Sequence, residues 1–135
     1  MLPALLRKAI TAKKENRPSM TVWGSGTPRR EFLYSEDLGD ACALLLSLPW
    51  ETVADAFPKP TLPLLNVGYG EDLTIRELAE AIADAAGFGG ALEWDRGKPD
   101  GTPQKLMDSS RMRALGWTPQ TSLQAGLRTI AAQLA

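Results

Sequence analysis

The chain has 135 residues, 44% of them hydrophobic and 23% charged, which is enough for a modest core and typical of a folded protein. Its net charge of -1 gives no overall attraction to nucleic acid or to a membrane surface. The absence of histidine excludes a Ser-His-Asp triad, a Cys-His pair and imidazole metal sites. One cysteine excludes an internal disulfide, and without a signal peptide or an apolar span the default location is the cytoplasm.

The front half of the chain predicts two helices with a pair of short strands between them. In chain order we expect a helix over 2–15, a strand over 20–23, a turn over 24–28, a strand over 31–34 and a helix over 36–48. The first helix starts at once, so the chain reads as cut, or as a domain whose preceding part lies elsewhere. Ser35 is the expected N-cap of the second helix, and Cys42 is expected in its buried face.

The back half predicts further short strands that alternate with helices. We expect an irregular connector over 50–63, strands over 64–68, 91–94 and 105–108, and helices that follow Thr74, Asp108 and Thr121. Thr74 and Glu77 have the spacing of a capping box, and Gly87 is the expected C-terminal stop of that helix. The predicted fold class is mixed α/β, as one domain over 1–135, with too few strands for a doubly wound sheet.

Cofactor and catalytic motifs are missing from the sequence. Gly24 and Gly26 have Arg29 where a dinucleotide fingerprint needs its third glycine, and the glycines at 68 and 70 have Leu73 there. Neither tyrosine is followed by lysine at the fourth position, as a short-chain dehydrogenase site requires. We therefore expect no cofactor site, no metal site and no catalytic residue in this chain. The acidic pairs at 36–37 and 71–72 are explained as helix starts.

Binding chemistry remains, and it concentrates in two segments. Arg30 and Lys105 are candidate phosphate ligands, the arginine through its fork and the lysine as a point charge. Trp23 can stack on a base, or it can be an ordinary core aromatic at the end of a strand. Asp100 lies in a Pro-Asp-Gly turn between Lys98 and Lys105, and a loop of this kind can hold sugar hydroxyls and phosphate together.

Four segments resemble the GDP-L-fucose synthase family, in order and over nearly the whole chain. They are Val22–Leu33, Asn66–Ala79, Lys98–Lys105 and Leu115–Pro119. The turn that follows Trp23, which we call the tryptophan turn, and the Lys-Pro-Asp-Gly-Thr-Pro loop together are specific to this family. The Asn-Val-Gly segment, by contrast, is widespread among extended short-chain dehydrogenases. The run Tyr34–Asp37 departs from the family's usual His-Val-Asp-Asp but keeps the acidic helix start.

The resemblance implies an NADPH-dependent epimerase and reductase that converts GDP-4-keto-6-deoxy-D-mannose to GDP-L-fucose. In that family a Rossmann domain holds NADP and the catalytic residues, a smaller C-terminal domain binds the GDP-sugar, and the enzyme is typically a homodimer. This chain resembles the C-terminal domain without the Rossmann domain, so we expect it to be inactive alone. The substrate contacts implied by position are Lys8, Trp23, Arg30, Asp100 and Lys105.

The tryptophan turn is then expected to form one wall of a nucleotide-sugar cleft, and residues 100–105 the opposite wall. Two alternatives stay open. The chain can be a non-catalytic interaction module that uses its basic first helix and an apolar surface left by the missing domain. It can also be the same domain of an extended short-chain dehydrogenase that acts on another nucleotide sugar.

Overall fold

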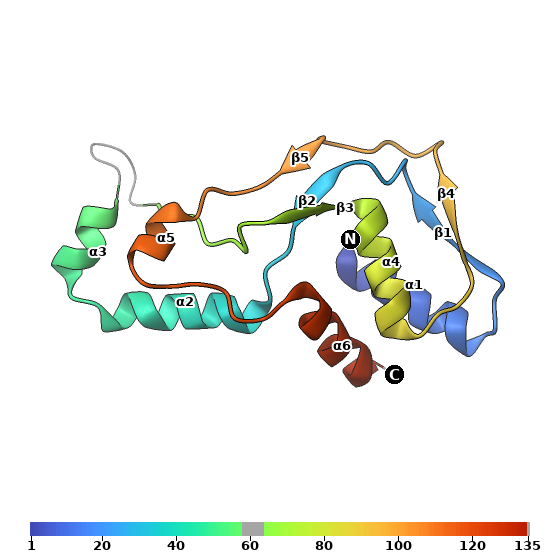
Figure 1. Cartoon of the computed structure of the whole chain (residues 1–135), viewed down its shortest axis with the longest axis horizontal. Coiled ribbons are helices and arrows are strands. Elements are labelled where there is room, and N and C mark those ends of the chain that lie inside the picture. Colours follow the sequence, from blue (N-terminus) through green and yellow to red (C-terminus); the bar gives the residue numbers. More distant parts are fainter. Residues whose placement is uncertain (58–63, 135) are drawn as a thin grey trace. The chain divides into compact units, whose positions relative to one another are not determined.

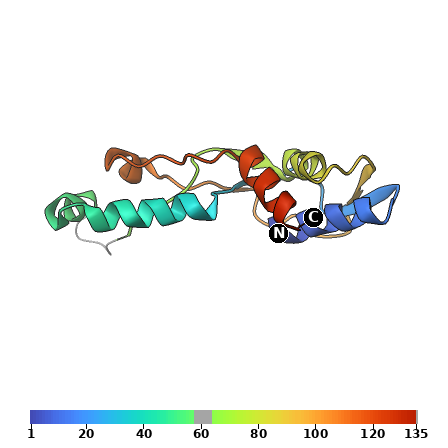
Figure 2. The same ribbon diagram turned by 90° about the horizontal axis from the view of Figure 1, so that it is seen from below.

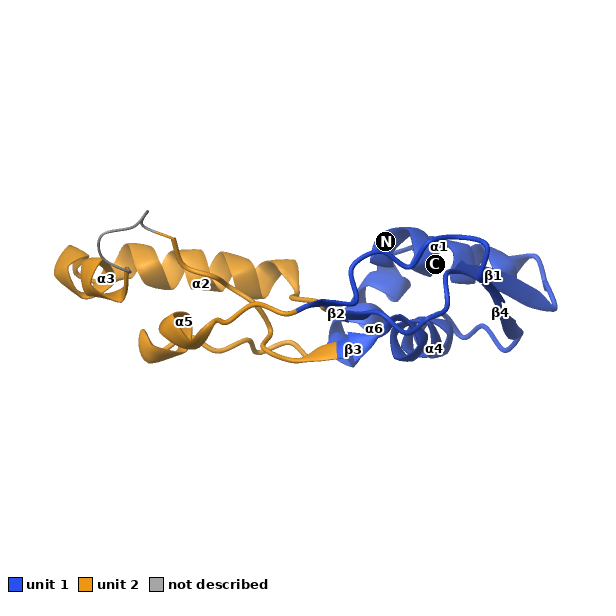
Figure 3. Cartoon of the chain, turned by 90° about the horizontal axis from the view of Figure 1, so that it is seen from above, with its two compact units in different colours: residues 1–30, 73–105, 123–135 blue, residues 31–72, 106–122 orange. Residues whose placement is uncertain are grey.

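A computed structural model describes residues 1–57 and 64–134, and these form two compact units (Figure 3). The first unit takes residues 1–30, 73–105 and 123–135, and the second takes 31–72 and 106–122. The elements in chain order are α1 (Leu2–Lys14), β1 (Ser19–Trp23), β2 (Arg29–Glu31), α2 (Ser35–Ser47), α3 (Trp50–Ala56), β3 (Asp72–Thr74), α4 (Ile75–Ala86), β4 (Ala91–Asp95), β5 (Gln104–Lys105), α5 (Ser110–Ala114) and α6 (Leu123–Leu134) (Figure 1). The mixed α/β class is confirmed.

The strands pair into two small sheets. β1 and β4 run parallel in register from Ser19 beside Ala91 to Trp23 beside Asp95. A second sheet has the strand order β3-β2-β5, and β2 and β5 are also parallel. Arg30 lies beside Lys105 in that register. The pairing therefore brings together two segments that are far apart in the sequence, and both carry candidate phosphate ligands.

The core of the first unit lies where α1, α4 and α6 pack together (Figure 2). Leu6, Leu78 and Ile82 are fully buried there, and Leu127 is 2% exposed. Each such side chain contributes about 2 kcal/mol by leaving water. β1 adds Met20 and Val22 on its inward face, as alternation along a strand dictates. This core anchors the strands that carry the candidate site.

The helix α4 is confirmed in its start and its stop. The Thr74 hydroxyl accepts a hydrogen bond from the backbone amide of Glu77 at 3.1 Å, and the Glu77 carboxylate accepts from the Thr74 amide at 2.7 Å. This reciprocal capping box satisfies amides that a helix start leaves free. Gly87 ends the helix with φ 64°, a backbone conformation that glycine adopts readily.

The second unit has a small core around Ala41, Met112 and Trp117. It also buries a carboxylate, because Asp37 is only 3% exposed. Asp37 accepts hydrogen bonds from the amides of Gln120 at 3.2 Å and Thr121 at 2.9 Å, and from the Thr121 hydroxyl at 3.0 Å. Asp37 therefore holds residues 120–121 against the start of α2, an arrangement that we call the Asp37 clamp. Its negative charge also interacts favourably with the dipole of that helix.

Several sequence predictions about elements are wrong. Residues 50–56 form the helix α3 where an irregular connector was expected, while residues 58–63 of that connector lie outside the described residues. No strand forms over 64–68, because a strand needs a hydrogen-bonded neighbour and no described segment pairs with it. The second strand of the front half lies at Arg29–Glu31, earlier than expected.

Two predictions about α2 also fail. The helix begins at Ser35, so Tyr34 occupies the N-cap position, and no side-chain cap hydrogen bond forms there. Cys42 is exposed, because the buried face of α2 runs through Asp37 and Ala41. An apolar run on this helix was therefore a poor guide to burial, and Leu46 is in fact 89% exposed. Among the described residues, no helix is both long enough and apolar enough to cross a membrane.

Candidate functional site

A cavity of about 540 Å³ opens on the first unit, within the size range of small-molecule sites. Its walls come from α1, β1, the turn between β1 and β2, β2 itself, the start of α4, and the loop between β4 and β5. The lining residues are Met1, Ala4, Leu5, Lys8, Thr21, Val22, Trp23, Gly26, Pro28, Arg30, Ile75, Pro99 and Asp100. The lining combines an apolar floor with two cations, one carboxylate and one indole.

The turn over residues 24–28, which we call the glycine turn, needs its two glycines. Gly24 and Gly26 have φ values of 88° and 82°, which other residues rarely adopt. A Cβ atom on Gly26 would lie 2.7 Å from the ring of Trp94. Arg76 covers that ring at 4.5 Å, and its amide donates to the Gly26 carbonyl at 3.0 Å. The turn is therefore fixed against β4 and the first turn of α4.

The glycine turn is joined directly to the loop over residues 96–103, which we call the Asp100 loop. The Ser25 amide donates to Asp100 Oδ1 at 2.6 Å, and the Ser25 hydroxyl donates to Asp100 Oδ2 at 2.8 Å. The Gly24 amide donates to the Asp95 carbonyl at 2.9 Å, at the start of that loop. A Cβ atom on Gly24 would collide with the Asp100 carboxylate, so the close approach requires glycine.

Hydrogen bonding to Ser25 lowers the pKa of Asp100 below its ordinary value, through the backbone amide first and the hydroxyl second; Arg96 adds a smaller effect. Because the folded chain favours the ionised form, the contact stabilises the fold at neutral pH. That contribution is lost as the pH falls through the lowered pKa. Asp100 is thus a fixed carboxylate at the cavity and can only accept hydrogen bonds there.

The structure decides between the two interpretations of Trp23, since this side chain is 67% exposed and is not a core residue. Its indole lines the cavity, and the Lys98 ammonium lies 5.3 Å from the ring centroid. Lys98 itself is not among the residues that line the cavity. The exposed indole offers a flat surface on which a ring can stack.

Two cations also face the cavity. The Arg30 guanidinium donates to the Arg29 carbonyl at 2.6 Å, which leaves further N–H groups of its fork for a ligand. The Lys8 ammonium donates to the Thr21 carbonyl and so ties α1 to β1. Lys105 is exposed and does not line the cavity, but it is the register partner of Arg30 on β5.

Four of the five residues predicted as substrate contacts therefore line one cavity: Lys8, Trp23, Arg30 and Asp100. Their role in binding stays a prediction. The glycine turn and the Asp100 loop, which were expected as opposite walls, are hydrogen-bonded to each other through Ser25 and Asp100. Helix α1 contributes Met1, Ala4, Leu5 and Lys8 to the lining. Sequence reasoning missed Ser25, although a serine between two glycines is a usual turn residue.

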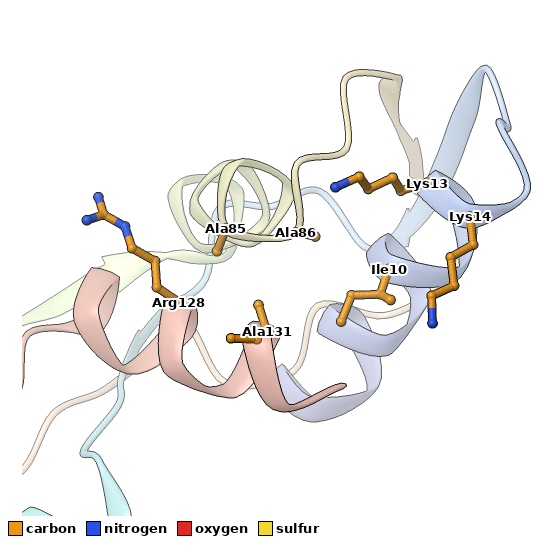
Figure 4. Close-up of a pocket in the computed structure, with 8 residues that line it drawn as sticks. Ile10, Lys13, Lys14, Ala85, Ala86, Arg128 and Ala131 are labelled. Carbon is orange, nitrogen blue, oxygen red and sulfur yellow. The ribbon is translucent and has the colours of Figure 1, made fainter. Parts of the chain in front are cut away.

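A second cavity, of about 380 Å³, lies among α1, α4 and α6. Ile10, Ala86 and Ala131 line it together with the cations Lys13, Lys14 and Arg128. Figure 4 shows that the charged ends of these side chains point in different directions. They offer no common point for an anion, so this cavity is the weaker candidate.

The glycine turns of the described residues do not have the arrangement of a dinucleotide fingerprint. A dinucleotide site needs a glycine-rich turn that runs from a strand into a helix. The glycine turn runs from β1 into β2, and the glycines at 68 and 70 precede β3. In residues 1–57 and 64–134, no group of three carboxylate or cysteine side chains gathers that could hold a metal ion.

Comparison with known proteins supplies the family. The family model described as the NAD dependent epimerase/dehydratase family matches residues 1–56. GDP-L-fucose synthase 1 of Arabidopsis thaliana is 49% identical over 127 residues, which cover 94% of this chain and 36% of that protein. The chain belongs to this family and is homologous to part of GDP-L-fucose synthase. It spans little more than a third of the length of this curated relative.

Solved structures of relatives agree with the observed fold. A GDP-6-OMe-4-keto-L-xylo-heptose reductase from C. jejuni superposes with a TM-score of 0.85 at 29% identity, over 98% of this chain and 46% of that one. A GDP-L-fucose synthetase from Naegleria fowleri, bound to NADP, has a TM-score of 0.80 at 25% identity, over 97% of this chain and 38% of that one. Both relatives are named for GDP-linked sugars, and the second binds NADP.

Proposed function

We propose that this chain is the GDP-sugar-binding part of a GDP-L-fucose synthase-like enzyme, which converts GDP-4-keto-6-deoxy-D-mannose to GDP-L-fucose with NADPH. Trp23, Arg30 and Asp100 line one cavity of about 540 Å³, and this observation carries the proposal. In this proposal NADP binding and catalysis belong to other parts of the enzyme, a view supported by a sequence that has neither a dinucleotide fingerprint nor a tyrosine followed by lysine at the fourth position. The chain alone is inactive under this proposal, and the whole enzyme is a cytoplasmic homodimer.

The cavity offers one type of contact for each part of a nucleotide sugar. The exposed indole of Trp23 can stack on the base. Arg30 offers a planar fork for the diphosphate, and Lys8 and Lys105 add positive charge nearby. Asp100, ionised and acceptor-only, repels phosphate and attracts hydroxyl groups. These requirements favour a ligand with a flat ring, a diphosphate and a hydroxyl-rich sugar.

Isothermal titration of the chain with nucleotide diphosphates tests the proposal. We expect GDP to bind with a dissociation constant of about 1 mM or below. The affinity should be weak because GDP lacks the sugar of the proposed ligand and only this part of the enzyme is present. UDP and dTDP are expected to bind at least roughly fivefold more weakly if the base is read, a difference of about 1 kcal/mol. Tighter binding of UDP or dTDP than of GDP would indicate a relative acting on another nucleotide sugar, and no saturable heat with any of the three would refute the proposal.

A second candidate, a non-catalytic interaction module, is favoured by one observation. The second unit exposes large apolar side chains at Leu38, Leu46, Trp50, Leu64, Leu106 and Met107. Such exposure on a folded unit is typical of a surface that another protein covers. Light scattering discriminates the candidates: a mass that rises with concentration and does not respond to GDP favours the module.

A further inference from the structure

Ser25 holds both oxygens of the Asp100 carboxylate through hydrogen bonds, and this contact orients the carboxylate. Every polar atom of Ser25 is committed to a neighbour in the first unit. Its amide and hydroxyl donate to the two Asp100 oxygens, and its carbonyl accepts from Arg76 at 3.2 Å. Its hydroxyl also accepts from the Thr27 amide at 3.1 Å. Ser25 is therefore held by Thr27 and Arg76 in addition to its contacts with Asp100.

The direction of the hydroxyl protons follows from counting donors. The Ser25 hydroxyl has one proton, and an ionised carboxylate can only accept, so that proton goes to Asp100. The Thr27 hydroxyl, 2.8 Å from the Ser25 hydroxyl, must then donate to it. The chain of donors runs from Thr27 through Ser25 to Asp100. Such a chain polarises each bond and fixes the orientation of the last acceptor.

The Asp100 carboxylate keeps free capacity. A carboxylate has about four acceptor positions, and Ser25 fills one on each oxygen. Asp100 lines the cavity, whereas Ser25 does not. The remaining lone pairs can therefore accept hydroxyl groups from a ligand, while Ser25 acts only through Asp100.

We propose that Ser25 is a positioning residue of the nucleotide-sugar site, which orients the Asp100 carboxylate to accept ligand hydroxyl groups. This inference rests on the proposed function. Orientation in advance matters because a free aspartate side chain loses rotamer entropy when it binds, and the Ser25 contact removes that loss before the ligand arrives. Ser25 contributes nothing to binding once Asp100 is removed.

A double-mutant cycle with GDP-mannose as the probe tests this dependence. Ser25→Ala is expected to weaken binding about fivefold, because the backbone amide of residue 25 still donates to Asp100. Ser25→Thr keeps the hydroxyl and is expected to bind within about twofold of the wild-type chain. Ser25→Ala combined with Asp100→Ala should bind no more weakly than Asp100→Ala alone, since the serine acts through the aspartate.

The control outcomes separate the two proposals. A thermal midpoint measured for each variant shows that the changes in affinity are not due to unfolding. Additive losses in the double variant, or Ser25→Ala affinity equal to wild type, overturn the positioning role and leave the proposed function standing. A wild-type chain that binds neither GDP nor GDP-mannose overturns both.

Discussion

Replacing Arg30 with alanine should weaken GDP binding by roughly thirtyfold, the equivalent of about 2 kcal/mol for hydrogen bonds to a charged group. Arg30 lies on β2 and lines the cavity, and its guanidinium donates to the neighbouring Arg29 carbonyl. That side-chain contact is local to β2, so the change removes ligand contacts with little effect on folding. Calorimetric titration with GDP measures the loss.

Two matched variants sharpen this prediction. Arg30→Lys keeps the charge and loses the fork, so it should recover only part of the affinity. Arg17→Ala removes one positive charge from a half-exposed side chain that pairs with Glu15 and does not line the cavity. It should bind GDP as the wild type does. If Arg17→Ala weakens GDP as much as Arg30→Ala, the effect is general electrostatics and the cavity is not the site.

Replacing Asp37 with alanine should lower the free energy of unfolding by about 3 kcal/mol, because it removes the buried acceptor that three part-buried hydrogen bonds share. Asp37 is 3% exposed and accepts from two amides and one hydroxyl of residues 120–121. Asp37→Asn retains one oxygen and should cost less. Urea unfolding measures the stability, and hydrogen exchange at Gln120 and Thr121 shows whether their amides lose protection.

Asp40 provides the control for Asp37, since it lies on the same helix with its side chain exposed. Asp40→Ala should change stability by no more than about 0.5 kcal/mol. Equal losses for the two aspartates would mean that Asp37 acts only through the charge at the start of α2. The buried clamp would then contribute nothing of its own.

Elements with local signals could be predicted from the sequence. The period of apolar residues in α1 and the capping box of α4 are both short-range, and both are confirmed. The strand over 64–68 could not be judged in the same way, because strand formation depends on a neighbour that the described chain does not supply. Residues 50–56 contain no internal proline, and they form α3 where the neighbouring prolines suggested a loop.

The candidate site shows the same division. The residue types of Trp23, Arg30 and Asp100 could be singled out from the sequence, and all three line the cavity. The contact that holds Asp100 in place could not be predicted, because Ser25 and Asp100 lie 75 residues apart in the sequence. The Asp37 clamp spans 84 residues to Thr121. Partners at such separations follow from the packing of whole elements, which no local pattern encodes.

The most direct test of the central claim follows the tryptophan indole N–H signals of the 15N-labelled chain during a GDP titration. The chain has four tryptophans: Trp23 and Trp94 belong to the first unit, and Trp50 and Trp117 to the second. We predict that the Trp23 signal moves and saturates with GDP, while Trp50 and Trp117 stay in place. A Trp23 signal that does not move at millimolar GDP, or movement confined to Trp50 and Trp117, would contradict a GDP-sugar site in the cavity of the first unit.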